Sequence, residues 1–357
     1  MEPSTSAGLH HTPDNIIYLI LREMGRTDLL KCKLISRRFQ RIIRHNAAFL
    51  ARPVVSELFV QMREAELRST KTGKVVKTSR HHCIQLRKKM QHSKSRKYLN
   101  IKNEDFLNGL ETALKSYSIS KTITLDGIEI NAQVLSEFIR PTSDFRNVEN
   151  VNFVLACFKQ TNHLLERLLE GTNCRNLSFE FCSDVQNVIN DTLFKSIQTL
   201  ESLNIVLAEP VRLVYLTNSS LDRWTDQDEL PTRIKLDNST TGFTVDGIFK
   251  LIQKLILAYQ QQKMKSSIDW SFGRIEASPA DLLSYIQRPS TRPPGYNLRL
   301  RAVQANHIRA WVDIDSKQGP VIESTPLAEL EKLARFGSAA KTEHSCLITF
   351  DVITPKV

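Results

Sequence analysis

The residues best suited to chemistry in this sequence are a His-His-Cys triplet at 81–83 and a Gly-Lys pair at 73–74. Imidazole and thiolate side chains bind zinc, and a lysine that follows a glycine-rich loop binds phosphate. Neither segment fulfils the pattern that its chemistry requires. Side chains of neighbouring residues point to different faces of a regular element, so the two histidines seldom share a metal ion. The phosphate loop needs glycine at position 68 and Ser or Thr at position 75, where this chain has Arg68 and Val75.

The remaining histidines, acids and thiols form no known catalytic spacing either. The sequence has no Gly-x-Ser-x-Gly, and its nine histidines show no His-x-x-x-His or His-Glu-x-x-His. The six cysteines are scattered without a Cys-x-x-Cys, which is typical of reduced core residues: Cys32, Cys83, Cys157, Cys174, Cys182 and Cys346. We therefore expect a protein that is not an enzyme, with no metal site and no cofactor.

Length and composition indicate a packed protein of two or three folding units. The chain has 357 residues, of which 41% are apolar and 24% charged. Residues 1–11 are polar and lack the apolar core of a secretory signal, so we expect a disordered tail there. The longest apolar run near the start, Ile16 to Leu21, is far shorter than the ~20 residues of a membrane-spanning helix. These features predict an intracellular protein, cytoplasmic and/or nuclear, without a membrane partner.

Positive charge is concentrated in the first third of the chain. Residues 1–102 hold 22 Lys and Arg against 7 Asp and Glu, a net charge of +15, whereas residues 103–357 hold 27 against 31, a net charge of −4. The run from Arg87 to Tyr98 is open to three interpretations: a nuclear-import signal, a phosphate-binding patch or a solvated loop. A nucleic-acid-associated scaffold that uses this basic third is the alternative function. No aromatic residues interleave with the charges as base stacking requires, so nucleic acid is the less favoured partner.

Three short helices are predicted between Thr12 and Arg44. Thr12 is a candidate N-cap, and Pro13 suits the first helical position. Gly25 suits a left-handed helix end, and Thr27 and Ser36 are candidate N-caps for the second and third helices. Apolar residues recur at three- and four-residue spacings in all three helices. A bundle this small cannot bury every apolar face by itself, so a surplus face is a candidate docking surface.

This segment resembles an F-box in three places that fall in the family's order: Pro13-Asp14, the Asp-Leu-Leu that ends at Leu30, and the Ile-Ser-Arg-Arg-Phe that ends at Phe39. The chain differs from the usual pattern in having Thr12 before the proline and Phe39 in place of tryptophan. F-box proteins are the receptor subunits of SCF ubiquitin ligases, and their F-box docks on a Skp-type adaptor that joins them to a cullin–RING core.

The resemblance implies a substrate-recognition adaptor that binds a Skp-type subunit through residues 12–44 and an unknown target protein through the repeat region described below. The alternative is a non-enzymatic scaffold that associates with nucleic acid or binds the Skp-type subunit. The apolar positions of the motif are the candidates for the adaptor contact or for the small core directly behind it: Pro13, Ile16, Ile17, Ile20, Leu29, Leu30, Leu34 and Ile35.

A repeated four-residue pattern follows, in which polar and apolar residues alternate. The first copy is Thr122–Leu125, and the apolar second residues of the first four copies are spaced 28, 26 and 26 residues apart. Such alternation predicts short strands with one buried face. Apolar helical patterns lie between the strands, for example at 134–139, 163–169, 193–197, 248–256 and 282–286. Strand and helix repeating at 26 to 34 residues is typical of a solenoid.

We therefore expect an α/β protein: a three-helix F-box followed by an irregular, leucine-rich-like β/α solenoid. The array is similar to the F-box-associated regions of the large nematode F-box families, by its repeat pattern and its place behind an F-box. A compact α/β domain would also alternate strand and helix, and that alternative stays open. In a solenoid the third position of each tetrad would line the concave sheet and is the candidate target-binding set: Thr124, Asn152, Ser178, Asn204, Lys235, Asp269 and Arg299.

The expected domain order is a tail at 1–11, the F-box at 12–50, a basic connecting segment at 51–102, the repeat region at 103–290 and a C-terminal cap or small α/β region at 291–357. Within the connecting segment, the residues after Val55 are ambiguous between strand and helix, with a turn at 70–73 favouring a hairpin. The Pro-rich stretch at 288–295 is expected to be a linker, followed by strands near 308–314 and 346–353 and a helix after Pro326.

Overall fold

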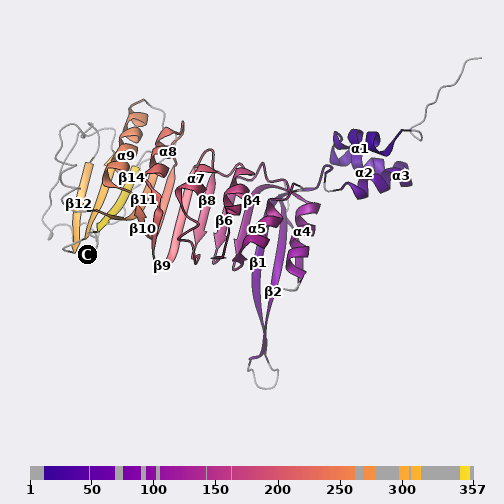
Figure 1. The fold of residues 1–357 in the computed structure, drawn as a ribbon, viewed down its shortest axis with the longest axis horizontal. Coiled ribbons are helices and arrows are strands. Elements are labelled where there is room, and N and C mark those ends of the chain that lie inside the picture. Colours follow the sequence, from indigo (N-terminus) through magenta and orange to yellow (C-terminus); the bar gives the residue numbers. More distant parts are fainter. Residues whose placement is uncertain are drawn as a thin grey trace, which may run out of the picture. The chain divides into compact units, whose positions relative to one another are not determined.

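The computed structural model describes residues 12–47, 49–68, 75–89, 94–101, 105–141, 143–161, 163–261, 268–277, 297–304, 307–314 and 346–353. The tail at 1–11, the linker at 288–295 and the two helices expected near 282–286 and after Pro326 lie outside these residues. Figure 1 labels the helices and strands. The chain divides into two compact units, residues 1–122 with 136–147, and residues 123–135 with 148–357. Within the described residues, no helix has the length and apolar character needed to cross a membrane.

The first unit begins with the three predicted helices, α1 (Asp14–Arg22), α2 (Arg26–Ile35) and α3 (Arg37–His45). They share a small core of buried side chains that alternate with exposed ones at helical spacing: Ile17, Leu21, Leu29, Cys32, Ile42, Ile43 and Leu50. Tyr18, Met24 and Phe39 pack against this core from its edge. The helices therefore bury one face each and leave the surplus apolar residues outside.

The helix ends differ in part from the sequence prediction. Ser36 caps α3 as predicted, because its hydroxyl accepts a hydrogen bond from the Phe39 amide at 3.2 Å. The predictions for Thr12, Pro13, Thr27 and the left-handed Gly25 are wrong. Pro13 is the N-cap of α1 and not its first residue, and Gly25 is the N-cap of α2, with an extended backbone of φ −66°. Since α1 ends in an ordinary tightened last turn, it requires no left-handed residue.

An ion pair fastens the start of α1 to α3. Arg38 donates from Nε to Asp14 Oδ1 at 2.7 Å, and it also donates to the carbonyl of Thr12. Arg41 approaches the other oxygen of Asp14 at 3.5 Å. Asp14 is half exposed, so the pair is expected to stabilise by ~1 kcal/mol or less, but it fixes where α1 begins.

An antiparallel sheet and one helix complete the first unit. The strands are β1 (Val54–Arg68), β2 (Val75–Lys89) and β3 (Lys94–Ile101), with β4 (Ser118–Asp126) beside β1, and the helix is α4 (Phe106–Ser116). The ambiguous segment after Val55 is thus a strand, and the expected hairpin is confirmed by the pairing of Arg68 with Val75. Of the three interpretations of the basic run, the solvated loop is contradicted, because residues 87–89 and 94–98 pair as strands.

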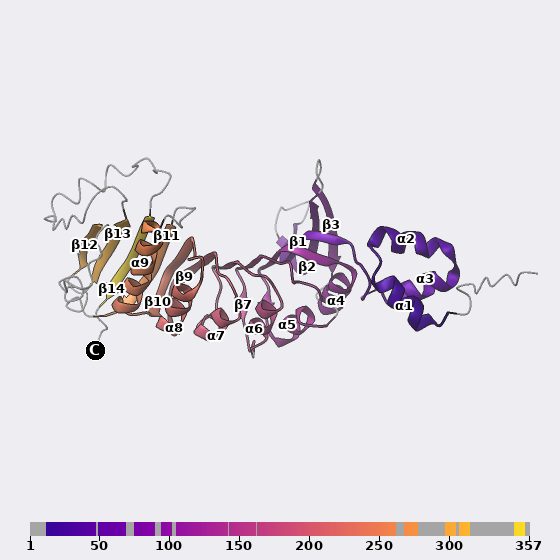
Figure 2. The ribbon, with the colours of Figure 1, turned by 90° about the horizontal axis from the view of Figure 1, so that it is seen from above.

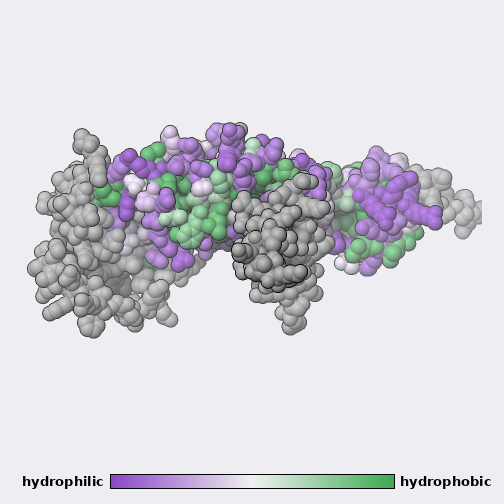
Figure 3. All heavy atoms as spheres, turned by 90° about the horizontal axis from the view of Figure 1, so that it is seen from below, coloured by the Kyte–Doolittle hydropathy of each residue, from purple (hydrophilic) through white to green (hydrophobic). Residues whose placement is uncertain are grey.

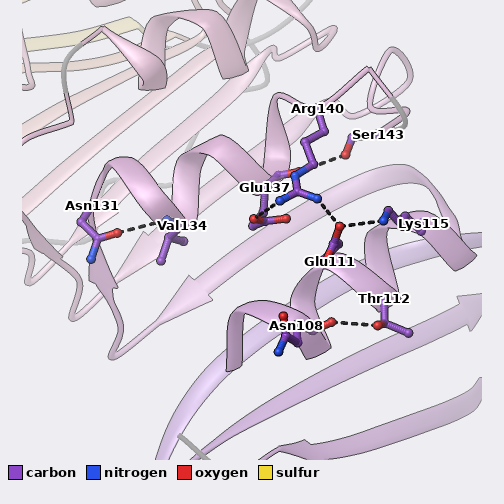
Figure 4. Close-up of polar contacts among 9 residues, drawn as sticks. All are labelled: Asn108, Glu111, Thr112, Lys115, Asn131, Val134, Glu137, Arg140 and Ser143. Carbon is purple, nitrogen blue, oxygen red and sulfur yellow. Dashed lines mark hydrogen bonds and ion pairs between the residues drawn. The ribbon is translucent and has the colours of Figure 1, made fainter. Parts of the chain in front are cut away.

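A buried carboxylate, that of Glu137, holds residues 136–147 in the first unit. Glu137 is only 7% exposed, and Arg140 donates to its Oε1 at 2.7 Å (Figure 4). Arg140 also contacts Glu111 on α4, and Lys115 lies 2.6 Å from the same carboxylate. The hydrogen bond from Lys115, together with the charge of Arg140, lowers the pKa of Glu111. The second oxygen of Glu137 has no hydrogen-bond partner among the described residues, so Arg140 is what compensates its charge.

Replacing Arg140 with alanine is therefore expected to destabilise the protein by about 2 kcal/mol. Removing one partner of a buried pair typically costs ~3–5 kcal/mol. Because Arg140 is 40% exposed, water will replace part of its contribution. Urea unfolding followed by circular dichroism measures the change. The double variant Glu137→Leu/Arg140→Ala should recover most of the lost unfolding free energy, since no buried charge remains. Equal stability of Arg140→Ala and wild type would contradict the role of Arg140.

The second unit contains a mostly parallel sheet. Its strand order is β12-β13-β14-β11-β10-β9-β8-β6-β4. Five neighbouring pairs are parallel: β6 with β8, β8 with β9, β9 with β10, β10 with β11, and β11 with β14. The strands are β6 (Asn150–Val154), β8 (Asn176–Glu180), β9 (Ser202–Thr217), β10 (Arg233–Gly242), β11 (Ile268–Glu276), β12 (Asn297–Gln304), β13 (His307–Ile314) and β14 (Cys346–Ile353). The described residues of every predicted tetrad lie on a strand. Strands β12 and β13 run antiparallel to their neighbours, unlike a continued parallel repeat.

Helices lie on one side of this sheet, as Figures 1 and 2 show. They are α5 (Ala132–Phe138), α6 (Leu164–Glu170), α7 (Asp191–Lys195), α8 (Asn218–Asp226) and α9 (Val245–Gln260). Polar side chains accept hydrogen bonds from the first-turn amides of four of them, at 2.8 to 3.3 Å: Asn131 at α5, Asn190 at α7, Thr217 at α8 and Thr244 at α9. Two short strands, β5 (Glu129–Ile130) and β7 (Cys157–Phe158), form a separate parallel pair.

The core of the second unit lies between the sheet and these helices. Burial alternates along the strands, so that in β6 Val151 and Phe153 are buried while their neighbours are half-buried. Phe153 stacks on Phe179 of β8 with ring centroids 5.1 Å apart, and Phe350 of β14 meets Phe249 of α9 edge to face. The opposite face, called the open face below, is not covered by any helix of the described residues.

Candidate protein-docking surfaces

The helices α1 and α2 expose a row of large apolar side chains. Six of the eight predicted adaptor-binding residues are exposed: Pro13, Ile16, Ile20, Leu30, Leu34 and Ile35. Leu34 keeps 88% of its surface in water and Ile35 63%. The other two, Ile17 and Leu29, are buried in the small core directly behind this surface. The predicted set thus contains six exposed residues and two core residues beneath them.

Sequence reasoning missed Leu19, which is 45% exposed on α1. It lies three residues after Ile16 and therefore on the same side of the helix, a spacing that could have identified it. Figure 3 shows hydrophobic side chains exposed on these helices. We call Pro13, Ile16, Leu19, Ile20, Leu30, Leu34 and Ile35 the helical docking face. Apolar surface of this kind binds another protein by removal from water and has no chemistry of its own.

Five of the seven predicted target-binding residues lie in one row on the open face. The pairing places Asn152 beside Ser178, Ser178 beside Asn204, and Asn204 beside Lys235. Thr124 lies next to Asn152, whose side-chain amide donates a hydrogen bond to the Thr124 hydroxyl at 3.3 Å. The tetrad pattern therefore identified neighbouring positions on five successive strands of the sheet.

The other two positions need correction or lie further along. Asp269 pairs with Arg233 and not with Lys235, so it lies one row away, and Ser271 takes the place predicted for it. The backbone of Arg299 does continue the row, although through antiparallel strands: it pairs with Trp311, which pairs with Thr349 of β14. The last copies of the tetrad pattern thus form strands, but their third positions do not all pair with one another in register.

The polar row is largely bonded to itself. Asn204 donates to the Ser178 hydroxyl at 3.1 Å and to Glu180 Oε1 at 2.8 Å, and Ser178 donates to the same carboxylate at 2.9 Å. Ser178 is buried at 8% exposure. Side chains that satisfy one another in this way define the sheet face, but they offer few free groups to a partner.

No chemistry beyond docking is evident in the described residues. No group of three or more His, Cys, Asp or Glu side chains in that part of the chain could hold a metal ion. Burial raises the pKa of Cys174 to about 12 and that of Cys182 to about 11, so both stay uncharged thiols at neutral pH. The side chains that stand out are apolar surfaces suited to contact with another protein.

Comparison with known protein families gives one match. Residues 13–48 match the model of the F-box domain. This range contains α1, α2 and α3 and every residue of the helical docking face. A search of curated proteins found no match.

Proposed function

We propose that this chain, whose residues 13–48 match the F-box domain, is the substrate-recognition adaptor of an SCF-type ubiquitin ligase. F-box domains bind Skp-type adaptors in SCF complexes, and F-box proteins are typically adaptors without catalytic activity of their own. The helical docking face would bind the Skp-type subunit, and through it a cullin–RING core. We further propose a cytoplasmic and/or nuclear location, where those partners would be met.

The observation that carries this proposal is the exposure of apolar residues over a core that is already complete. Leu30, Leu34 and Ile35 are roughly half to nine-tenths exposed, although Leu29 and Cys32 of the same helix are buried. Each large apolar side chain taken out of water contributes ~1.5–3 kcal/mol. Six such residues on α1 and α2 are consistent with a stable protein interface and have no evident role in folding.

The second unit would hold the target protein. Its mostly parallel sheet with helices on one side supports the proposed solenoid, and no helix of the described residues covers the open face. The mechanism is proximity: a target held beside the ubiquitin-charged conjugating enzyme reacts as if the step were unimolecular. The adaptor would supply position, and the conjugating enzyme would supply the activated ubiquitin.

Calorimetric titration of the purified full-length chain with a purified Skp-type adaptor tests the proposal. A saturable one-to-one complex is the expected result. Binding should depend weakly on salt, since the helical docking face is apolar and its contacts are not screened by ions. No detectable complex from a chain shown by circular dichroism to be folded would overturn the proposal.

A second candidate function rests on where the charge lies. Residues 51–102 hold 14 Lys and Arg against 3 Asp and Glu, a net charge of +11, and most of them lie on β1, β2 and β3. If this sheet bound nucleic acid, the affinity for a labelled oligonucleotide would fall steeply between 50 and 200 mM salt, by ~10³-fold or more for six phosphate contacts. Absent or salt-insensitive binding would remove this candidate.

A further inference from the structure

Strand β3 ends the sheet of the first unit and has a partner strand on one side only. It pairs with β2 from Lys94 to Ile101, and within the part of the chain that the structure describes no strand lies on its other side. Successive residues of a strand point their backbone N–H and C=O groups to opposite sides, so about half of these groups in β3 point away from β2. Such an edge is a template on which another chain can form a further strand.

This edge lacks the irregularities that commonly protect an exposed strand. Strand β3 is eight residues long, contains no proline and pairs with β2 without a register shift, so it has no bulge. Charge is the protective device that it does have, in Lys94, Arg96 and Lys97, with no Asp or Glu. Like charges placed opposite each other repel, so these residues hinder pairing with a second copy of the same strand. The same charges attract a strand that carries carboxylates.

Strands β2 and β3 together carry a large surplus of positive charge. They hold eight Lys and Arg and no Asp or Glu. Like charges lie opposite each other in the register at two places, where Arg87 pairs with Arg96 and Lys89 pairs with Lys94. Glu57 of β1 lies 3.0 Å from Arg87 and balances that one cation. Cross-strand pairs of like charge are unfavourable for the sheet alone, and a bound anion beside β3 would relieve this repulsion.

A peptide strand fits this edge better than a nucleic acid does. Residues 83–86 of β2 are at most 3% exposed, so both faces of the strand are covered there. Phe59 pairs with Gln85 on one of these faces, and its ring already has Arg87 as a partner, with the guanidinium carbon 5.6 Å from the ring centroid. This part of β1 and β2 therefore offers bases little to stack on. Phosphate oxygens only accept hydrogen bonds, whereas a strand satisfies both the N–H and the C=O groups of an edge.

We propose that β3 binds an extended acidic segment of the target protein, which joins the sheet as a further strand and has Asp or Glu at alternate positions. The inference rests on the proposed function and adds a contact in the first unit to the one proposed for the second. Main-chain hydrogen bonds to the edge supply the pairing, and charge supplies the selectivity. Alternate positions of a strand share a face, so the carboxylates of such a segment suit the cations at positions 94 and 96.

Fluorescence anisotropy with a labelled peptide of four Thr-Glu pairs tests the proposal on the full-length chain. The variant Lys94→Gln/Arg96→Gln is expected to bind this peptide at least tenfold more weakly, with a thermal midpoint equal to or above that of wild type, because cross-strand repulsion is reduced. The control Arg26→Gln/Lys31→Gln removes the same charge from exposed positions of α2 and should bind like wild type.

A second peptide tests the strand pairing itself. It has proline in place of two of the threonines, so it keeps all four carboxylates but loses backbone donors and cannot form a regular strand. This proline peptide is expected to bind the wild-type chain at least tenfold more weakly than the Thr-Glu peptide.

Three results would overturn the inference: no binding of the Thr-Glu peptide to wild type, equal binding of the proline peptide, or equal loss of binding in the two charge variants. If Lys94→Gln/Arg96→Gln has a lower thermal midpoint, the proline peptide decides the matter, since that comparison uses the wild-type chain alone. Binding of a labelled oligonucleotide without binding of the Thr-Glu peptide would also overturn it, in favour of nucleic acid. The peptide assay contains no Skp-type adaptor, so its failure is separate from failure of the adaptor titration.

Discussion

Replacing Leu30 with glutamate is expected to abolish binding to the Skp-type adaptor. Leu30 is 47% exposed on α2, in line with Leu34 one turn later, so the change leaves the buried core of the three helices intact. In the complex, the carboxylate would be held in a desolvated interface without a partner. Loss of a residue at the centre of an interface costs at least ~2 kcal/mol, which is about thirtyfold in affinity or more. Titration calorimetry against wild type measures the effect.

Lys31→Glu is the matched control for this variant. It introduces the same side chain one position along the same helix, where the lysine is exposed and its ion pair is with Asp28 at 3.4 Å. This control should bind the adaptor within about threefold of wild type and should unfold at nearly the same temperature. If Leu30→Glu also bound within twofold of wild type, the helical docking face would not be the adaptor surface.

The fold of the first fifty residues was largely predictable because its signals are local. Three apolar helical patterns and the capping serine at Ser36 were present in the sequence, and the structure confirms the helices and that cap. The errors concern single helix ends: Gly25 is extended where a left-handed turn was expected. Several residue types are compatible with a helix end, and the residue at which the helix actually ends depends on how the next helix packs. The sequence did not show which of the predicted adaptor-binding residues are exposed and which are buried, because that depends on how the three helices pack.

The second unit was predictable strand by strand, but not in its pairing. Alternation in each tetrad fixes which side chains are buried, and the described residues of every tetrad lie on a strand. It contains no information on which distant strand becomes the neighbour. Strand β14, at the end of the chain, lies beside β11, and the antiparallel β13 and β12 follow it. The tetrad of β11 begins one row early, which put Asp269 in the place of Ser271.

Helix α8 and the left-handed turns escaped sequence analysis for different reasons. In α8 the buried residues are Ser220, Leu221 and Trp224, too few for an apolar period to stand out. Leu155 and Phe181 adopt a conformation that sequence rules assign to glycine or asparagine, so no rule would have placed them there. Positions where a local rule fails without a folding benefit are candidates for function, and the exposed Leu155 and Phe181 are two such positions.

Gly273→Ala is expected to destabilise the protein by about 3 kcal/mol or more. Gly273 has φ +64°, where an alanine costs ~1 kcal/mol in backbone strain. A Cβ atom at this position would lie 2.3 Å from the Leu236 carbonyl oxygen and 2.8 Å from that of Ser239. Both atoms belong to the backbone of β10 at its bulge, so relief requires the two paired strands to separate. Overpacking against fixed backbone adds ~1–3 kcal/mol to the strain.

Gly171→Ala is the control that separates the close approach from the general loss of a glycine. Gly171 follows α6 with φ −78°, an ordinary conformation for alanine, and a Cβ atom there would lie 3.4 Å from the Leu168 carbonyl oxygen. Its stability should stay within ~0.5 kcal/mol of wild type. Thermal and urea unfolding of the two variants side by side measure the difference. Similar stability for both would show that β10 and β11 do not approach as closely as described.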